Sequence, residues 1–318
     1  MKIIPHGKIF DPTDHALSNG CHEFAQSPQA IVFDDYVRIY FSTRSVDPGG
    51  KYISHALYAD FDKTLQNILS VATEPVIAPA QLGAFDEHGI FPFHVMRHGE
   101  KIFAYTTGWS RRVSVSVETG IGLAISEDRG TSFTRIGSGP VLTASVHEPF
   151  LVGDAFVRYF EERFHMWYIF GQKWKQFPDS PNLERVYKIG HVTSKDGVTW
   201  GPGSGLQIIP DTLSSDESQA LPSVVKSGDS YHLFFCYRES VDFRKTPGRG
   251  YRLGYAKSSD LKSWHRHDEL LEMERHLSDW DQNMQCYPHI FECDGRTFLL
   301  YNGNEFGRFG FGAAEVIL

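Results

Sequence analysis

The sequence lacks the features that mark several large protein classes. It has no run of about 18 apolar residues, which a membrane-spanning helix would need. Its 4 cysteines show no zinc-site spacing and no dense disulfide framework. The formal net charge of -8 is opposite to the basic excess of a nucleic-acid-binding protein, and the N-terminal residues meet polar side chains too soon for a secretory leader. We therefore expect a soluble, cytoplasmic protein that binds neither membranes nor nucleic acid.

Signatures of cofactor and metal chemistry are also missing. We find no Gly-rich phosphate loop, no dinucleotide fingerprint and no Ser-nucleophile elbow. The chain has 15 His, and His88, His94 and His147 would be the metal candidates if the fold brought them together. No His-x-Glu-x-x-His or similar spacing is present, however. We expect no metal and no cofactor.

What the sequence does contain is a repeated unit, which reads as a polar cluster, a proline, an apolar strand, a tight turn and a second strand. A third strand and a Ser-x-Asp hairpin follow in several copies. Aromatic residues make up 14% of the chain, with 29 Gly and 16 Pro to form turns, a balance typical of many short strands. The copies recur roughly every 65 residues, as expected of a repeat array. They begin at Pro28, Pro92, Pro149, Pro222 and Pro288.

Five such units predict an all-β fold, namely one five-bladed β-propeller domain over residues 1–318 with four-stranded antiparallel blades. A lone strand from Lys2 to Phe10 has no partner nearby in sequence. We expect it to complete the last blade beside Gly310 to Val316 and so close the ring. In this geometry the segments before the prolines and the loops after the second strands lie on one face, where we expect the functional site.

Acidic residues recur in the segments before the prolines. Asp86, Glu148 and Glu217 stand in three successive units. Carboxylates that converge on an axis raise one another's pKa, as a general acid beside a base requires. We predict these three residues to be catalytic, although each also fits an ordinary loop position. Predicted substrate-binding residues from the same segments are Glu23, Gln26, Glu87, His88, Asp216, Gln285 and Tyr287.

The loops after the second strands are rich in aromatic and cationic residues. Aromatic faces suit sugars, because a pyranose has an apolar face and a rim of hydroxyl groups. A cationic excess in a chain of net charge -8 indicates an anionic group in the ligand, such as phosphate or carboxylate. Blade packing and solvated loop charge are the alternative interpretations. The residues predicted to bind substrate here are Arg44, Trp109, Lys173, Trp174, Arg238 and Asn302.

These repeats resemble the five-bladed β-propeller superfamily that contains glycoside hydrolase families 32, 43, 68 and 130. The resemblance rests on the Pro-led hairpins, on the Ser-x-Asp turns, and on the run from Tyr301 to Ala313, which is similar to the ending of uncharacterised propeller glycosylases. It covers nearly the whole chain and implies an acidic residue from each of three blades. Asp86 or Glu87 matches the second of these and Glu148 the third.

The first acidic position departs from that pattern, because Gln26-Ser27 stands where an Asp is expected before the first proline. The resemblance then leaves Glu23, Asp216 or Glu217 as the base, or phosphate as the nucleophile, as in the phosphorolytic relatives of family 130. The Ser-x-Asp turns also resemble the sialidase Asp-box, but the Arg triad with its leading Phe-Arg-Ile-Pro motif is not found.

The sequence therefore predicts a carbohydrate-active enzyme that cleaves or transfers a glycosidic bond in a small-molecule or oligosaccharide substrate. In this hypothesis Glu148 is the acid and Asp86 orients it, while Glu217, or phosphate assisted by Arg238, serves the attacking side. One alternative is a transferase or rearrangement enzyme acting on a sugar-derived or other polar metabolite. The other is a non-catalytic carbohydrate-binding propeller.

Overall fold

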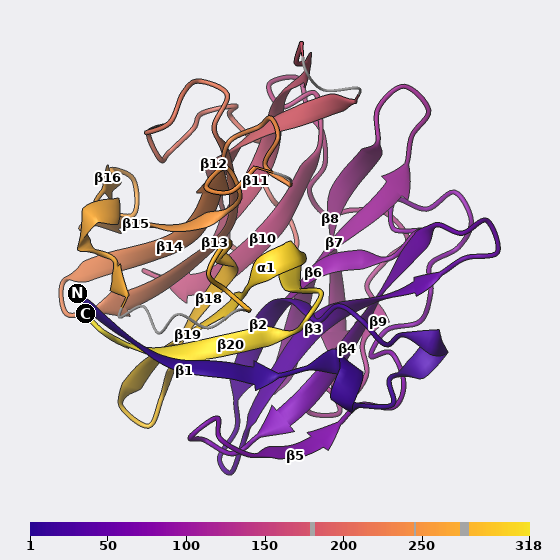
Figure 1. The fold of residues 1–318 in the computed structure, drawn as a ribbon, viewed down its shortest axis with the longest axis vertical. Helices are drawn as coiled ribbons and strands as arrows, with labels where there is room; N and C mark the ends of the chain where they lie inside the picture. The colour runs from indigo at the N-terminus through magenta and orange to yellow at the C-terminus, as the bar shows by residue number, and fades with distance from the viewer. Residues whose placement is uncertain (179–181, 245, 274–279) are drawn as a thin grey trace.

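Five β-sheets arranged around an axis make up the protein (Figure 1). The computed structural model describes residues 1–178, 182–244, 246–273 and 280–318. Each sheet contributes one innermost strand, and these five strands contact their neighbours in the closed order β2, β6, β10, β13, β18 and back to β2. The five-bladed β-propeller predicted from the sequence is confirmed.

The blades follow one another in chain order. Blade one contains β2 (Gln26–Val32), β3 (Val37–Val46), β4 (Tyr52–Phe61) and β5 (Ile68–Val71). Blade two contains β6 (Ile90–His98), β7 (Lys101–Arg111), β8 (Val117–Ser126) and β9 (Thr134–Arg135). Blade three contains β10 (Val152–Phe160), β11 (Arg163–Gln176) and β12 (Leu183–Ser194). Blade four contains β13 (Ser218–Ser227), β14 (Ser230–Arg238), β15 (Arg252–Ser258) and β16 (His265–Arg266).

Blade five joins the two ends of the chain. It contains β18 (Cys286–Cys293), β19 (Arg296–Asn302) and β20 (Phe311–Ile317), followed by β1 (Lys2–Phe10) and β17 (Glu272–Met273). Strand β1 pairs antiparallel with β20, with Lys2 opposite Ile317, so the predicted closure by the N-terminal strand is confirmed. The ring therefore closes through hydrogen bonds between the first and last strands, whose ends lie together in Figure 1.

The helical segments are single turns. They are η1 (Pro12–Asp14), η2 (Ser18–Gly20), η3 (Asp268–Leu270) and α1 (Asn304–Gly307). Within the described ranges, no helix has the length and apolar character needed to cross a bilayer.

The hydrophobic core lies between adjacent blades, because each sheet presents alternate side chains to the next sheet. Between blades one and two, the ring centroids of Tyr40 and Phe93 are 5.5 Å apart, and those of Phe93 and Phe133 are 5.0 Å apart. The Tyr40 hydroxyl, which is buried in this layer, donates to the Gly130 carbonyl at 2.6 Å. Buried aromatic rings thus fix each blade against its neighbour, and this leaves the axial ends of the strands available for a site.

Each inner strand is interrupted near its start by a β-bulge. In four blades a residue at the bulge takes a positive φ, and this residue precedes a proline in blades one, four and five. In blade three the corresponding pair is Asp154-Ala155. The sequence pattern predicted that the third repeat begins at Pro149, and this prediction is wrong. Pro149 lies in the loop before β10, which begins at Val152. The positive-φ residues are Ser27, Asp154, Leu221 and Tyr287.

Candidate active site

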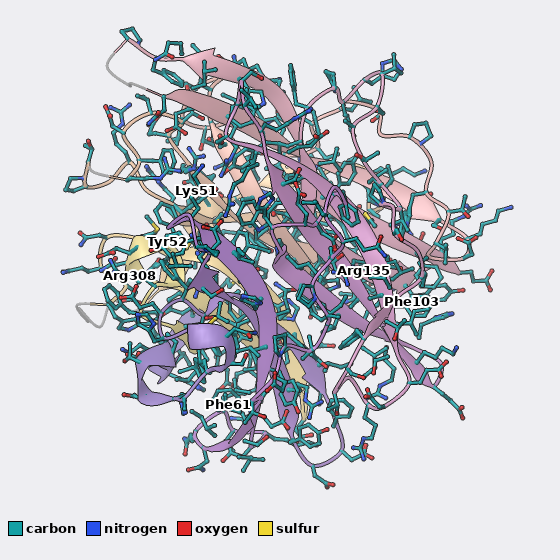
Figure 2. The ribbon with its side chains drawn as sticks, turned by 90° about the vertical axis from the view of Figure 1, so that its right-hand side faces the viewer. Lys51, Tyr52, Phe61, Phe103, Arg135 and Arg308 are labelled. Atoms are coloured by element: carbon teal, nitrogen blue, oxygen red, sulfur yellow. The ribbon has the colours of Figure 1, made fainter. Side chains whose placement is uncertain are left out.

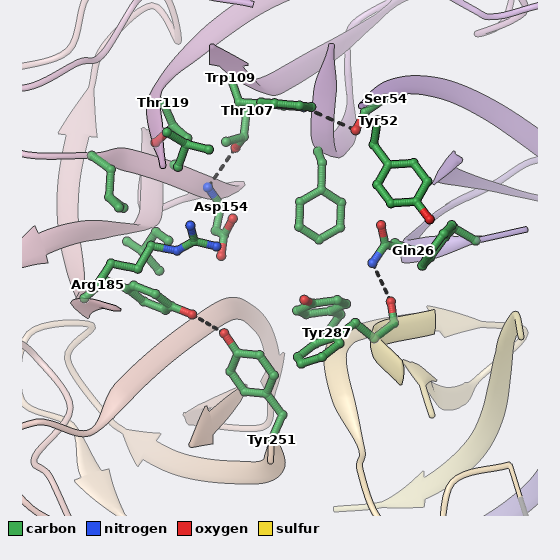
Figure 3. A pocket seen from close by; sticks show the side chains of 18 of the residues that line it. Gln26, Tyr52, Ser54, Thr107, Trp109, Thr119, Asp154, Arg185, Tyr251 and Tyr287 are labelled. Atoms are coloured by element: carbon green, nitrogen blue, oxygen red, sulfur yellow. Dashed lines mark hydrogen bonds between the residues drawn. The ribbon is translucent and has the colours of Figure 1, made fainter. Parts of the chain in front are cut away.

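A cavity of about 400 Å³ opens on the face where the inner strands begin and the second strands end (Figure 3). Every blade contributes to its wall, for example Gln26, Trp109, Asp154, Arg238 and Tyr287 from blades one to five. Figure 2 shows blade one from its side, with Tyr52 at the cavity end of β4 and Phe61 at the opposite end. The cavity occupies the face on which we expected the functional site, and its size is in the range of small-molecule sites.

Asp154 is a buried carboxyl in this wall. It occupies the bulge of β10 with φ 53°, a conformation that Asp tolerates better than most residues, and its backbone N–H donates to Thr107 Oγ1 at 2.7 Å. Burial raises the pKa of Asp154 from 3.8 to about 7, although the Leu221 N–H and the Arg185 charge act in the opposite direction. A carboxyl of this pKa keeps its proton near neutral pH, so it can act as a general acid.

Three arginines of the wall are Arg44, Arg185 and Arg238. In the described part of the chain, no carboxylate lies within ion-pair distance of any of the three, whereas Arg111 and Arg244 of the same wall pair with acidic residues. The Nε atoms of Arg44 and Arg238 are buried and have no hydrogen-bond partner among the described residues. Buried donors without partners are costly, and an oxyanion bound in the cavity would satisfy them.

Aromatic rings hold two of these arginines in place. The guanidinium carbon of Arg44 lies 4.8 Å from the Phe24 ring centroid, and burial lowers the pKa of Arg44. Arg238 lies 3.5 Å from the Phe243 ring centroid, and its Nη2 donates to the Tyr187 hydroxyl at 3.0 Å. Each cation is therefore fixed before any ligand arrives, which reduces the entropy lost on binding.

The remaining wall is largely aromatic. Trp109 donates through Nε1 to Ser54 Oγ at 3.2 Å, and His88 stacks on its ring at 5.5 Å. Across the cavity in Figure 3, Tyr287 lies near Tyr251, with ring centroids 5.6 Å apart. Flat apolar faces with hydroxyl groups at their edges suit the faces and rims of sugar rings.

Five of the residues predicted from the sequence to bind substrate line this cavity. The predicted catalytic carboxylates do not. Asp86 accepts from Arg135 Nε at 2.8 Å, and Glu148 accepts from the Tyr168 hydroxyl at 2.7 Å. The predicted residues in the cavity wall are Gln26, Arg44, Trp109, Arg238 and Tyr287.

Glu217 is fully buried and lies within blade four. Its Oε1 pairs with Arg266 at 2.6 Å and its Oε2 accepts from the Thr212 N–H at 2.9 Å, and these contacts help to lower the pKa of Glu217 although burial acts against them. The three carboxylates thus bind groups of their own blades rather than sharing one cavity wall. Their catalytic roles remain predictions.

The other predicted residues surround the cavity or support its wall. Glu23 pairs with Arg308 at 2.9 Å, and Glu87 accepts from the Gly83 N–H at 2.8 Å. His88 contacts Trp109 of the wall, as described above.

Lys173 pairs with Asp216 at 2.7 Å, and Trp174 packs on the core between blades three and four. Gln285 donates its backbone N–H to the Tyr251 carbonyl at 3.1 Å. Asn302 is buried and accepts from the Ser27 N–H at 2.7 Å, so it holds the start of β2 against blade five. None of these eight side chains is part of the cavity wall in the described residues, and their predicted contacts with substrate remain predictions.

Sequence reasoning missed Asp154, Arg185, Tyr187 and Tyr251. Asp154 is followed by Ala155 and not by the proline that marks the other repeats, so the sequence pattern places the start of the third unit at Pro149. The repeats are more evenly spaced when the third unit is counted from Ala155 instead of Pro149, and this regularity was the signal that could have located Asp154. The other three lie in third strands or in long connections, where no repeat pattern singles them out. Among the residues that the structure describes, no three His, Cys, Asp or Glu side chains are grouped to hold a metal ion.

No protein-family model matches the chain. Solved structures similar to it include a glycoside hydrolase, with a TM-score of 0.73 and 15% identity over 99% of this chain and 92% of that protein. A beta-1,2-mannobiose phosphorylase from Listeria innocua has a TM-score of 0.67 and 12% identity over 99% and 97%. A thermostable family-43 glycoside hydrolase has a TM-score of 0.64 and 12% identity over 92% and 87%. At these identities the likeness concerns the fold.

Two proteins of Mycobacterium tuberculosis are similar in sequence along nearly their whole length. The uncharacterized protein MT1551, from strain CDC 1551 / Oshkosh, is 31% identical over 309 residues, which are 97% of this chain and 97% of the relative. The uncharacterized protein Rv1502, from strain ATCC 25618 / H37Rv, gives the same values. The chain therefore belongs to the family of MT1551 and Rv1502, and its fold is the five-bladed β-propeller of the glycoside hydrolases and phosphorylases.

Proposed function

We propose that the protein is a carbohydrate-active enzyme that cleaves a glycosidic bond, with Asp154 as the general acid and with an anionic group held by Arg44, Arg185 and Arg238. The observation that carries this proposal is a buried carboxyl with a pKa of about 7 in the wall of a cavity lined by aromatic rings and by three arginines that have no described carboxylate within ion-pair distance. The glycoside hydrolases and phosphorylases among the similar structures support the same class of substrate.

In the proposed reaction, Asp154 donates its proton to the glycosidic oxygen as the bond from that oxygen to the anomeric carbon breaks. The sugar passes through an oxocarbenium-like transition state. The aromatic rings of Trp109 and Tyr287 hold the sugar faces, and the arginines fix the register of the substrate through its anionic group. Because Arg44 and Arg238 are already held by their neighbours, the substrate is oriented with little loss of freedom.

Two sources of the anion fit the arginines. The anion is either a carboxylate or phosphate group on the sugar itself, or inorganic phosphate that attacks the anomeric carbon in place of water. The lack of ion-pair partners for the three arginines among the residues that the structure describes favours both equally. Assay of a panel of 4-nitrophenyl glycosides, with neutral, uronic and 6-phosphorylated sugars, separates them when each is tested with and without inorganic phosphate. Dependence of turnover on inorganic phosphate identifies phosphorolysis, and preference for charged sugars without phosphate identifies hydrolysis.

The sequence-based assignment of Glu148 as the acid, with Asp86 and Glu217 in support, is the competing proposal. A Cβ added at Gly203 would lie 1.8 Å from Glu148 Oε2, so the chain around Gly203 covers this carboxylate and would have to move to admit a sugar. The variants Asp154→Asn and Glu148→Gln separate the two assignments. We expect Asp154→Asn to lower kcat by about 10²- to 10⁴-fold, the usual contribution of a general acid. Full activity of Asp154→Asn together with loss of activity in folded Glu148→Gln would refute our assignment.

A further inference from the structure

The α1 turn contains two successive residues in the left-handed region. Glu305 has φ 55° and ψ 34°, and Phe306 has φ 60° and ψ 36°. Left-handed backbone is disfavoured for residues that carry a Cβ atom and is normally left to Gly, Asn or Asp. Neighbouring structure must impose such a conformation, and strained backbone of this kind concentrates at functional sites.

Strand β2 and the residues before it impose this turn. The Gln26 side-chain amide donates to the Phe306 carbonyl, the Ala25 N–H donates to the Gly307 carbonyl at 3.0 Å, and the Phe24 N–H donates to the Arg308 carbonyl at 3.0 Å. The turn is thus attached to the start of blade one by three successive hydrogen bonds. Its position is fixed relative to the cavity wall.

The strained turn brings Glu305 and Phe306 into the cavity wall. Among the described residues of that wall, Asp154 and Glu305 are the carboxylic acids. They come from different blades, because Asp154 lies at the bulge of β10 in blade three, whereas Glu305 lies in the turn between β19 and β20 of blade five, which is attached to Gln26 of blade one. A buried acid and a second carboxylate in the wall of one cavity supply the two groups that cleavage of a glycosidic bond by an attacking water requires.

The surroundings of Glu305 differ from those of Asp154. The Glu305 side chain is 56% exposed, and Arg308 Nη1 donates to its carboxylate at 3.1 Å. Arg308 is itself held by Glu23 through a bond of 2.9 Å. An exposed carboxylate can reach a water molecule that attacks the sugar, whereas a buried carboxyl is suited to the protonated role of an acid.

We infer that Glu305 is the general base of the site and that the strained α1 turn exists to present it. This inference rests on the proposed function and adds that the acceptor is water. In the reaction, Glu305 takes a proton from water as the water oxygen bonds to the anomeric carbon. At the same time Asp154 gives its proton to the departing oxygen. The sugar and the leaving alcohol are the products, and exchange with solvent restores both carboxyl groups.

The test compares leaving groups that differ in their need for a proton. Asp154→Asn and Glu305→Gln are assayed with the 4-nitrophenyl and 2,4-dinitrophenyl glycosides of the sugar that the native protein cleaves. Loss of a base affects attack by water, so we expect Glu305→Gln to lower kcat by about 10²- to 10⁴-fold with both leaving groups. Dinitrophenolate leaves without protonation, so Asp154→Asn should lose little with that substrate. Added azide, which needs no base, should restore turnover of Glu305→Gln and yield a glycosyl azide.

Two further variants separate catalysis from folding. Glu118→Gln is the matched control, because Glu118 lies between two wall residues of β8 while its own side chain pairs with Arg112 at 3.1 Å outside the cavity. It should keep native activity. Glu305→Gly relieves the left-handed strain, so it should raise Tm while losing activity as Glu305→Gln does.

The outcomes that overturn the inference are distinct from those that overturn the proposed function. Turnover within threefold of native in Glu305→Gln, or full activity in a stabilised Glu305→Gly, refutes the role of Glu305 and leaves Asp154 in place. A rate loss in Glu305→Gln that azide does not restore assigns Glu305 to substrate positioning and also refutes the inference. Absence of turnover by the native protein across the whole panel refutes both proposals.

Discussion

Replacement of Asp154 by Asn removes a buried carboxyl whose titration should affect stability as well as catalysis. The residue is 7% exposed, and burial raises its pKa from 3.8 to about 7. The folded protein therefore holds this proton more tightly than the unfolded chain does. Stability is undiminished below the unfolded pKa and falls as the pH rises toward the folded pKa.

The size of the effect follows from the shift. Each pKa unit corresponds to about 1.4 kcal/mol, so the penalty for keeping Asp154 in its site grows by about 1.4 kcal/mol per pH unit between pH 4 and 7 and reaches about 4 kcal/mol above that range. The amide of the Asn variant does not titrate. The stability of Asp154→Asn relative to the native protein should therefore increase by roughly 2 to 3 kcal/mol between pH 5 and pH 8.

Urea denaturation of both proteins at pH 5, 6, 7 and 8 measures this difference. The Asn variant is the appropriate comparison because it preserves the shape of the side chain. In parallel, kcat of the native protein should decrease above pH 7 as Asp154 loses its proton. A stability difference that stays constant across this pH range would show that Asp154 titrates normally, and the assignment of Asp154 as the acid would then lose its physical basis.

Three other changes test the binding site and the fold. Arg44→Met should raise KM for an anionic substrate roughly 10- to 100-fold by removing a charged hydrogen bond, while an unchanged KM in steady-state assays would exclude an anion contact. Arg38→Met should lower the free energy of unfolding by about 3 to 5 kcal/mol in urea titrations, because Asp60, held at 2.7 Å, is left buried and unpaired. Gly89→Ala should lower Tm, since Gly89 has φ 112° and a Cβ there would lie 2.0 Å from the Ser54 carbonyl oxygen; a native melting curve would contradict the described register of blades one and two.

Much of the fold could be predicted from the sequence, because each feature of the repeat depends on interactions between residues that are close in the chain. A proline before an apolar strand, a tight turn after it and a Ser-x-Asp hairpin each act over a few residues. The Asp196 carboxylate, for example, accepts from the Val198 and Thr199 N–H groups at 2.9 and 2.7 Å and so fixes its own hairpin. Closure of the ring could be predicted because the strand that begins at Lys2 has no partner nearby in the sequence.

The site was less accessible, because the exposure of a carboxyl depends on the neighbouring blades. Glu148 and Asp154 are six positions apart in sequence and both are buried, yet Glu148 faces Tyr168 of its own blade and Asp154 faces the cavity. Arg44 and Arg238 could be recognised from the sequence, because each lies at the end of a second strand and this position in the repeat determines the face of the propeller on which the residue lies. The place of Glu305 in the cavity wall results from a strained turn, and no local sequence pattern predicts that turn.

The pairing of β1 with β20 also determines how the molecule responds to tension. Lys2 lies opposite Ile317, so both chain ends leave the ladder at the same end of an antiparallel pair. A force that pulls the ends apart then acts on one hydrogen-bonded pair at a time instead of shearing the whole ladder at once. The β1–β20 pair should therefore separate under a smaller force than the strand pairs of the other blades. A short peptide that joins the two chain ends should prevent this separation.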